Sequence, residues 1–515
     1  MASSEESPAG LVNSRASVAG AGWNCDSNGF ETRIPEEEKN HPFSWINPVP
    51  LWQSRNDRVV RHFGDPTNDE RREWMKRVRA VHGSDLTIDH RDLAAPSFIV
   101  AGDTGEGDAS QWAVVPRIEQ VGEQTDFMVI ASDVIYPAGG VDDYENKFYL
   151  PYSNYPRPIY AVPGNHDWYD GLTGFMYHLC GQRTPPPKAA AGPRSLLGRF
   201  LWRKAKRPHP ESLERMRTLR AQPGQRSTQV SPYWVIDTGP LQLIGIDTGI
   251  TNVLDREQGA WFRDVSKATD KPKILITGKP LYVDARYDPG AIDGGGTVDE
   301  VVRDPACNYV AAIGGDIHNY QRYPVQLADG RIVMYIVSGG GGAFMHATHT
   351  IPRVSTPVVG EDDFRCYPLR GDSLSFYSQA YAARFKHNPF RRLRQSISPN
   401  QALSYMHERL GIAPSKGDDA LEPVTGATRA AAERIFPRQG PNAHGLLQPI
   451  FSEYLDWNTA PLFKHVLWVQ ATDGEIRVRC IAATGCVGDE RADPEDDLRA
   501  ELGGDGRYAW RWPRR

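Results

Sequence analysis

Apolar and polar positions alternate in blocks along the chain, and four short apolar runs are each followed at once by a polar segment. The runs are Ser97–Ala101, Phe127–Ala131, Pro158–Val162 and Tyr309–Ile313. Short runs rich in β-branched residues that are stopped by Gly or Pro predict buried strands. The stretch 111–124, between the first two runs, predicts a crossover helix and so a right-handed βαβ unit.

The polar segments that follow these runs carry metal-ligand residue types. Their sequences are Gly102-Asp103-Thr104-Gly105, Ser132-Asp133-Val134-Ile135-Tyr136, Gly164-Asn165-His166-Asp167 and Gly315-Asp316-Ile317-His318. Loops at the carboxyl ends of the strands converge on one edge of an α/β sheet. We therefore expect the four segments to form a single site.

Further strands are predicted on both sides of the last run. They are Tyr233–Ile236, Leu241–Ile246, Lys273–Thr277, Arg331–Ser338, His465–Gln470 and Ile476–Ile481. The first two flank a short turn and predict a hairpin. The last two flank Thr472-Asp473-Gly474-Glu475, and Asp-Gly between strand patterns is a strong hairpin signal.

The chain divides into five predicted parts. Residues 1–40 are polar and predicted to be disordered, 41–95 form a lead-in with a helix at 68–82, and 96–350 form the core with an insertion at about 183–230. Residues 351–450 form a second insertion with helices at 375–385 and 399–410, and 451–515 supply strands that complete the sandwich, followed by a tail.

The order Asp-x-Gly, Asp-x-x-Tyr, Gly-Asn-His-Asp and a late x-x-His resembles the calcineurin-like metallophosphoesterases. The Asp-x-Gly and Asp-x-x-Tyr forms are similar to those of the purple acid phosphatase branch, and the resemblance covers about residues 95–350. It implies an α/β fold: a two-sheet β-sandwich flanked by helices, here with large helical and loop insertions.

The resemblance also implies a ligand set. A first metal ion takes Asp103, Asp133, Tyr136 and His318, a hard, electron-rich set that suits Fe(III). Asp133 bridges to a second ion, which also takes Asn165. His166 faces the substrate, where it hydrogen-bonds the phosphate or protonates the leaving group.

Two positions depart from the family pattern, because Lys279 and Asp316 stand where the second ion normally receives a His. Lys279 is a poor ligand, since its ammonium must first lose a proton. Three accounts remain open. In the first, Lys279 replaces the second cation and stabilises a phosphoryl oxygen. In the second, Asp133, Asn165 and Asp316 hold a labile ion such as Mn(II), Mg(II), Zn(II) or Fe(II). In the third, the site is mononuclear and has different chemistry.

Three further residues are candidates for the site. His346 and His349 follow a run of four glycines, which lets backbone approach a ligand closely, and either imidazole is a candidate for binding metal or substrate. Arg322 lies four residues after His318 and is a candidate phosphate contact.

Composition narrows the choice of partners. The formal net charge of -5 gives no case for nucleic acid, and the six cysteines contain no CxxC. The amino terminus lacks a signal-peptide pattern and no apolar run reaches the ~20 residues of a membrane span, so we expect a cytoplasmic protein. Basic segments at 183–226 and 384–394 either contact an anionic membrane or are solvated surface insertions.

Two functions follow as hypotheses. The first is a metal-dependent phosphoesterase, in which a metal-bound hydroxide attacks a phosphomonoester or phosphodiester of a small molecule or lipid. The alternative is a descendant of the fold without hydrolytic activity or with a single iron, or a pseudoenzyme that binds its partner. Lys279 and Asp316 favour the alternative, whereas the five retained residues Asp103, Asp133, Asn165, His166 and His318 favour the enzyme.

Overall fold

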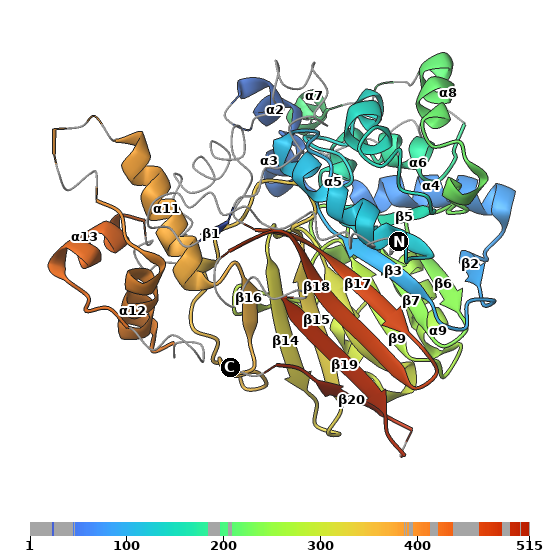
Figure 1. Ribbon diagram of the computed structural model, residues 1–515. Coiled ribbons are helices and arrows are strands. Elements are labelled where there is room, and N and C mark those ends of the chain that lie inside the picture. Colours follow the sequence, from blue (N-terminus) through green and yellow to red (C-terminus); the bar gives the residue numbers. More distant parts are fainter. Residues whose placement is uncertain are drawn as a thin grey trace, which may run out of the picture.

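Two eight-stranded sheets face each other and form the centre of the molecule in this computed structural model (Figure 1). The structure describes residues 23–24, 45, 47–183, 196–203, 206, 209–385, 387, 389–390, 395–412, 421–435, 463–486, 495–504 and 506–513. The predicted amino-terminal segment 1–40 therefore lies almost wholly outside the described residues. So do parts of both basic segments, including 184–195 and 391–394.

The first sheet has the order β20-β19-β18-β17-β3-β4-β5, and the short strand β1 pairs with β18. β3, β4 and β5 are parallel and the others are antiparallel. The bounds are β1 Trp23–Asn24, β3 Ser97–Ala101, β4 Phe127–Ala131, β5 Ile159–Val162, β17 Lys464–Ala471, β18 Glu475–Cys486, β19 Asp496–Leu502 and β20 Tyr508–Arg511. Strands from the end of the sequence thus extend the sheet that begins at β3.

The second sheet has the order β16-β14-β15-β13-β9-β7-β6-β2. Its bounds are β2 Thr87–His90, β6 Trp234–Thr238, β7 Gln242–Ile246, β9 Lys273–Thr277, β13 Tyr309–Gly314, β14 Tyr320–Gln326, β15 Ile332–Ser338 and β16 Arg365–Tyr367. β7, β9, β13 and β15 run parallel, so their carboxyl ends lie at the same edge. Short strands outside the two sheets are β8 Val253–Leu254, β10 Tyr282–Val283, β11 Arg286–Tyr287 and β12 Ala291–Ile292.

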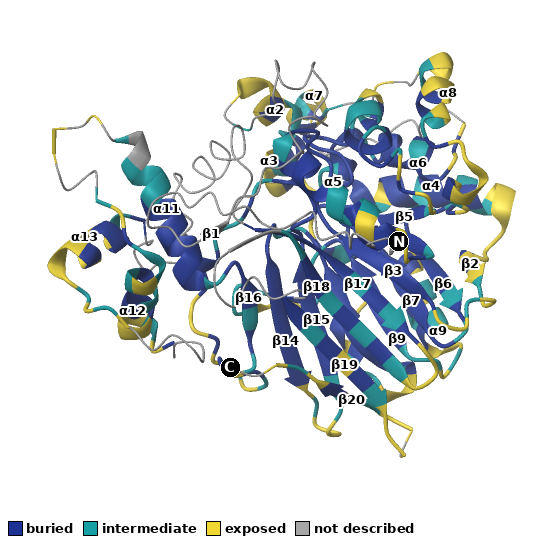
Figure 2. Ribbon diagram, in the orientation of Figure 1, coloured by how far each residue is buried: buried dark blue, intermediate teal, exposed yellow. Residues whose placement is uncertain are grey.

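Helices cover the outer face of each sheet. Alternate residues of β3 point to opposite faces, so Phe98 and Val100 enter the core between the sheets while Ile99 packs against the helix side. α4 (Thr67–His82) and α5 (Ala109–Gly122) cover the first sheet, and α9 (Arg256–Lys267) and α10 (Val298–Arg303) cover the second. The strands of both sheets are mostly buried (Figure 2). The predicted fold class, a two-sheet sandwich flanked by helices, is confirmed.

The remaining helices lie in the lead-in and the insertions. They are α2 Pro48–Gln53, α3 Asn56–Phe63, α6 Thr173–His178, α7 Leu196–Leu201, α8 Pro210–Thr218, α11 Arg370–Arg384, α12 Pro399–Leu410 and α13 Gly426–Ile435. Short 3-10 turns occur at Val141–Asp143, Asp167–Asp170, Pro223–Gln225, Pro305–Cys307 and Thr348–Thr350, and a π-helical turn spans Glu145–Tyr149. Every helix among the described residues is too short or too polar to cross a bilayer.

Helix boundaries differ from the sequence predictions where a cap decides them. α5 begins two residues before the predicted start because the Asp108 side chain accepts hydrogen bonds from the backbone N–H groups of Ser110 and Gln111. α11 likewise begins earlier than predicted, at Arg370. The predicted helix 399–410 and both predicted hairpins are confirmed. The five-part division of the chain stays a prediction.

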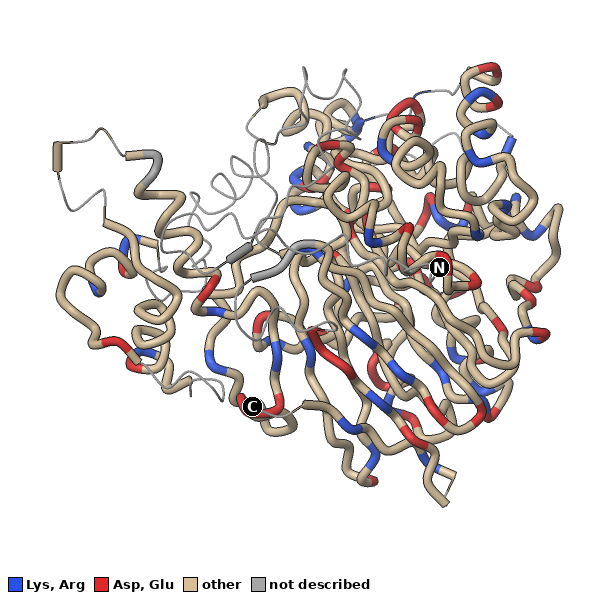
Figure 3. The backbone as a smooth tube through the Cα atoms, in the orientation of Figure 1, with Lys and Arg blue, Asp and Glu red and all other residues tan. Residues whose placement is uncertain are grey.

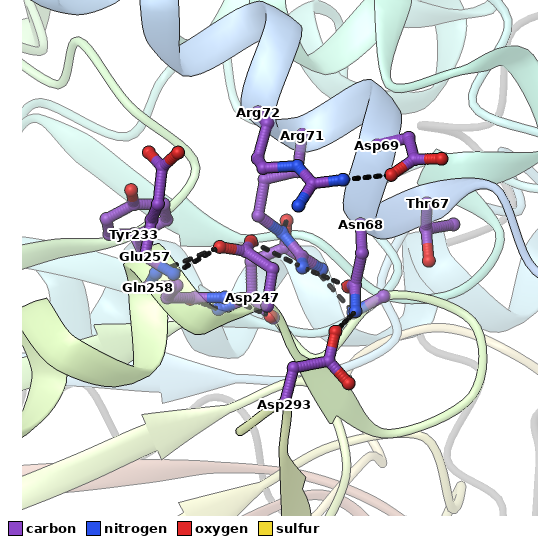
Figure 4. A network of polar contacts seen from close by, with 12 residues as sticks. Thr67, Asn68, Asp69, Arg71, Arg72, Tyr233, Asp247, Glu257, Gln258 and Asp293 are labelled. Carbon is purple, nitrogen blue, oxygen red and sulfur yellow. Dashed lines mark hydrogen bonds and ion pairs between the residues drawn. The ribbon is translucent and has the colours of Figure 1, made fainter. Parts of the chain in front are cut away.

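A buried ion cluster ties the lead-in to the core (Figure 4). The Arg71 guanidinium of α4 is fully buried and lies 2.8 Å from Asp247 Oδ2 and 3.1 Å from Asp255 Oδ2. Asp247 Oδ1 also accepts a hydrogen bond from Trp168 Nε1, two residues after His166. Although burial lowers the pKa of Arg71, the two carboxylates raise it above its ordinary value. The lead-in therefore supports the loop that carries the Asn-His motif.

We expect Arg71→Met to lower the free energy of unfolding by about 3–5 kcal/mol, because it leaves buried carboxylates without a counter-charge. Denaturant unfolding followed by circular dichroism measures the change. Arg72→Met is the matched control: Arg72 pairs with Asp69 on the exposed face of the same helix, so its loss should cost about 0–1 kcal/mol. Equal losses in the two variants would contradict the assignment.

Candidate metal centre

Four loops that follow strands of both sheets meet at one edge of the sandwich. Asp103 follows β3 and Asp133 follows β4 in the first sheet, whereas Asp316 follows β13 in the second. Three residues here have positive φ: Asp103 (57°), Ser132 (88°) and Asp316 (67°). Such strain costs of order 1–3 kcal/mol per residue and clusters at functional sites. The expected gathering of the motifs is present, but it draws on two sheets rather than one.

Three candidate ligands of the first ion lie close together. The Tyr136 hydroxyl is 3.2 Å from Asp103 Oδ1 and 3.1 Å from His318 Nε2. Ligand atoms about 2.1 Å from one octahedral ion lie about 3 Å apart, so these spacings fit donors to a single ion. The other carboxylate oxygen, Asp103 Oδ2, is buried and makes no hydrogen bond within the described part of the chain. The donor set therefore fits a metal ion.

The tautomer of His318 also fits this role. Its Nδ1 lies 2.6 Å from the Phe344 carbonyl oxygen, which can only accept, so Nδ1 carries the proton and Nε2 presents a lone pair. Burial lowers the pKa of His318 well below its ordinary value, which keeps the ring neutral. The His346 ring stacks on His318 with centroids 4.2 Å apart, and its Nδ1 accepts from the His318 backbone N–H at 3.2 Å. His346 thus braces a candidate ligand.

Carboxylates at the centre repel one another. Burial first, and then the charges of Asp133 and Asp316, raise the pKa of Asp103 well above its ordinary value. Burial likewise raises the pKa of Asp133, against an opposing effect of His166. Asp133 Oδ1 accepts the His166 backbone N–H at 2.8 Å. A cation in this cluster would relieve the repulsion.

Asn165 and His166 lie next to Tyr169, in the loop after β5. Asn165 Nδ2 donates to the Tyr169 hydroxyl at 2.7 Å, while Asn165 Oδ1 is buried without a hydrogen-bond partner among the described residues. That oxygen suits a ligand to a second cation. His166 Nδ1 donates to the Pro137 carbonyl at 2.8 Å, which leaves Nε2 for proton transfer.

Lys279 pairs with the other unusual residue of the second site. Its ammonium lies 2.8 Å from Asp316 Oδ1, and both side chains are largely buried. Burial lowers the pKa of Lys279, but Asp316 raises it above its ordinary value, so the lysine is charged at neutral pH. The two departures from the family pattern therefore form an ion pair, with the ammonium beside the carboxylates.

Two sequence candidates are not brought to this cluster. Arg322 is buried on β14, with Nε 3.3 Å from Asp496 Oδ2 and Nη2 donating to the Pro513 carbonyl. His349 is buried, with Nδ1 2.9 Å from the Ser373 hydroxyl of α11. Neither of these sets of contacts involves a candidate metal ligand, so we leave both residues out of the proposed site.

Comparison with known proteins found one matching family over the part of the chain that carries the motifs. The model of the calcineurin-like phosphoesterase family matches residues 96–320. Residues 96–320 are a calcineurin-like phosphoesterase domain. A search of curated proteins found no match.

Several solved structures are similar to this chain. A purple acid phosphatase from yellow lupin (Lupinus luteus) is 10% identical over 76% of this chain and 52% of its own, with a TM-score of 0.37. PhoD is 10% identical over 82% of this chain and 72% of its own, with a TM-score of 0.35. GAP50, described as the anchor in the inner membrane complex of Plasmodium, is 14% identical over 52% of this chain and 76% of its own, with a TM-score of 0.31. The chain thus spans about half the length of the lupin phosphatase.

The calcineurin-like domain has an unusual donor set for a metal centre. No group of three or more His, Cys, Asp and Glu side chains among the described residues is arranged to hold an ion. Two of the candidate ligands, Tyr136 and Asn165, are of none of these four residue types, and Lys279 pairs with Asp316.

Three supporting residues escaped the sequence analysis. Trp45, from the lead-in, places its ring 5.9 Å from that of Tyr136 and 5.3 Å from that of His166. Glu106 accepts from Trp45 Nε1 and from the Phe344 backbone N–H, and Lys147 donates to the Tyr136 carbonyl. Only Glu106 had a sequence signal, its place directly after the first motif. Trp45 lies 61 residues from Glu106, and no local pattern connects them.

Proposed function

We propose that the calcineurin-like domain is a metal-dependent phosphoesterase that holds one ion tightly and uses Lys279 as its second positive charge. The observation that carries the proposal is the position of the Tyr136 hydroxyl, which lies 3.2 Å from Asp103 Oδ1 and 3.1 Å from His318 Nε2. Asp133 would be the fourth ligand. The phenolate and carboxylate donors support Fe(III) as the ion at this position.

The bound ion would supply a Lewis acid that activates water and polarises a phosphoryl oxygen. The residues of the chain supply the rest. Lys279, oriented by Asp316, would neutralise charge on a second phosphoryl oxygen as the transition state forms. His166, oriented by the Pro137 carbonyl, would give its Nε2 proton to the leaving oxygen. The buried oxygen of Asn165 would keep the phosphate or a labile ion such as Mn(II), Mg(II), Zn(II) or Fe(II) in place.

This scheme serves a phosphomonoester or a phosphodiester, because neither the ion nor Lys279 distinguishes the two. Comparing turnover of p-nitrophenyl phosphate with turnover of bis(p-nitrophenyl) phosphate shows whether the substrate is a phosphomonoester or a phosphodiester. The metal content of the purified chain tests the scheme itself, and we expect one tightly held ion per chain.

The second candidate is a pseudoenzyme that binds a phosphorylated partner without hydrolysing it. The ion pair between Lys279 and Asp316 favours it, since the pair occupies donors that a second metal ion would use. Metal-free protein that binds phosphate and turns over neither ester would support this candidate and contradict the first.

His166→Ala should retain the metal and lower kcat for p-nitrophenyl phosphate by on the order of 100-fold, because the leaving oxygen loses its proton donor. The matched control is His62→Ala: His62 is an exposed histidine of α3, and among the described residues its ring hydrogen-bonds only to its own helix. Steady-state kinetics and elemental analysis of the same preparations measure both effects. Full activity in His166→Ala would remove this residue from the mechanism.

A further inference from the structure

Two short helices carry a concentrated group of exposed apolar side chains. Eleven large apolar residues are exposed in the described part of the chain, and six of them lie on α2 and α7. They are Val49, Leu51, Trp52, Leu196, Leu197 and Phe200, with exposed fractions of 51% to 84%. We call these six residues the apolar patch. α2 is coloured largely as exposed in Figure 2. Concentrated exposed apolar surface marks an interaction site.

The apolar patch is built as a unit. Arg55, just after α2, donates from Nε to the Leu201 carbonyl at 2.7 Å and so joins α2 to α7. Its guanidinium lies 4.5 Å from the centre of the Trp52 ring. A groove of about 410 Å³ runs between α2, α3 and the end of α7, lined mainly by apolar residues. The three helices lie together at the top of Figure 1.

The charge around the patch is positive although the chain as a whole is negative. Stretches 47–63 and 196–203 contain five arginines (Arg55, Arg58, Arg61, Arg199 and Arg203) and a single acidic residue, Asp57. The full chain has a net charge of -5, and its acidic and basic residues are otherwise interspersed (Figure 3). Exposed aromatic and aliphatic side chains in segments that also carry several arginines match the surface of an anionic bilayer.

The same helices rest on the loops of the candidate metal centre. Arg203, which follows α7, donates to the Ala138 carbonyl at 2.9 Å, two residues after Tyr136. Asn56 of α3 donates to the Tyr169 carbonyl, and the Tyr169 ring lies 4.7 Å from that of His166. Trp45, which contacts Tyr136 and His166, precedes α2 by only three residues. A surface held by the patch would therefore lie beside the centre.

We propose that the apolar patch docks this chain on an anionic phospholipid bilayer and that the substrate is a phosphate ester of a lipid. The substrate part rests on the proposed function. Water oxygen bonds to phosphorus and gives up a proton to solvent, the P–O bond to the lipid alcohol breaks, and the leaving oxygen takes the Nε2 proton of His166. Docking presents headgroups to the centre without extracting the lipid, since Arg203 and Asn56 join the helices of this surface to the loops of the centre.

Co-sedimentation with vesicles tests the docking. We expect the chain to bind phosphatidylcholine vesicles that contain phosphatidic acid, to bind pure phosphatidylcholine weakly, and to dissociate as salt rises. Trp52→Glu with Phe200→Glu should weaken binding by on the order of 100-fold, and Arg58→Ala by about fivefold. Val81→Glu is the matched control, because Val81 is 74% exposed on α4. Wild-type binding in the Trp52/Phe200 variant, or an equal loss in Val81→Glu, would overturn the docking surface.

Turnover separates this inference from the proposed function. The Trp52/Phe200 variant should hydrolyse p-nitrophenyl phosphate at the wild-type rate and lose hydrolysis of phosphatidic acid in vesicles. Binding to anionic vesicles without hydrolysis of either compound would overturn the proposed function and the lipid substrate while supporting the docking surface. A wild-type dimer that the variant converts to a monomer, with no vesicle binding, would assign the patch to a second copy of the chain and overturn the proposal.

Discussion

Asp133→Asn protein is expected to purify without stoichiometric metal and to turn over p-nitrophenyl phosphate at least about 1,000-fold more slowly than the wild type. The carboxylate follows β4, lies among the other donors and would be lost as an anionic ligand. A catalytic ion supplies several kcal/mol of transition-state stabilisation, and each 1.36 kcal/mol is a factor of ten in rate. His318→Ala should behave in the same way, because it removes the imidazole donor.

The control for this prediction is Asp142→Asn, which neutralises an exposed aspartate in the chain segment that follows Tyr136. It should keep both the metal and the rate. Elemental analysis, circular dichroism and initial rates on the same samples distinguish loss of the ion from loss of the fold. Folded Asp133→Asn protein with full metal content and full turnover would rule out Asp133 as a ligand.

Lys279→Met is expected to keep the tightly held ion and to lower kcat by on the order of 100- to 1,000-fold. The ammonium is the only side-chain cation that the described structure holds against Asp316, and a donor aimed at developing charge contributes about this much. The matched control is Lys271→Met. Lys271 lies just before the same strand, β9, and the change removes its ion pair with Asp237. That variant should retain its rate.

A double replacement, Lys279→His with Asp316→His, tests the same assignment by gain of binding. Two imidazoles beside Asn165 and Asp133 should create a second site that holds Zn(II) or Fe(II) more firmly through dialysis. Native protein that already retains two ions through dialysis would contradict the role of Lys279 as the second charge. Unchanged turnover in Lys279→Met would contradict it as well.

The strand ends were predictable from sequence because the signal is local. β3, β4 and β9 have the predicted bounds, since an apolar run is stopped at once by residues that break strands. The helix at 399–410 was predictable for the same reason: its cap lies next to it in the sequence. The two-sheet class was implied by the resemblance of the four motifs to the calcineurin-like family.

Contacts between distant segments could not be predicted in this way. The ion pair of Lys279 and Asp316 was not among the three open accounts, and only the fold brings the two residues to 2.8 Å. Arg322 lies near the last motif in sequence, but Arg322 and Tyr320 share a face of β14 and both contact Asp496. Trp45 reaches the centre from a segment without any motif. Chain position near a motif therefore indicated which residues gather at the site, but not the residues that support them.

The ion cluster of Arg71 has a consequence for anyone who expresses this domain alone. A fragment cut at 96–320 would lack α4, and so leave Asp247 and Asp255 buried without their guanidinium. It would also lack β17, whose backbone pairs with β3, the strand that leads to Asp103. The boundaries by which the family is identified are thus narrower than the unit that can fold, and a workable fragment has to begin before α4 and retain the carboxyl-terminal hairpin.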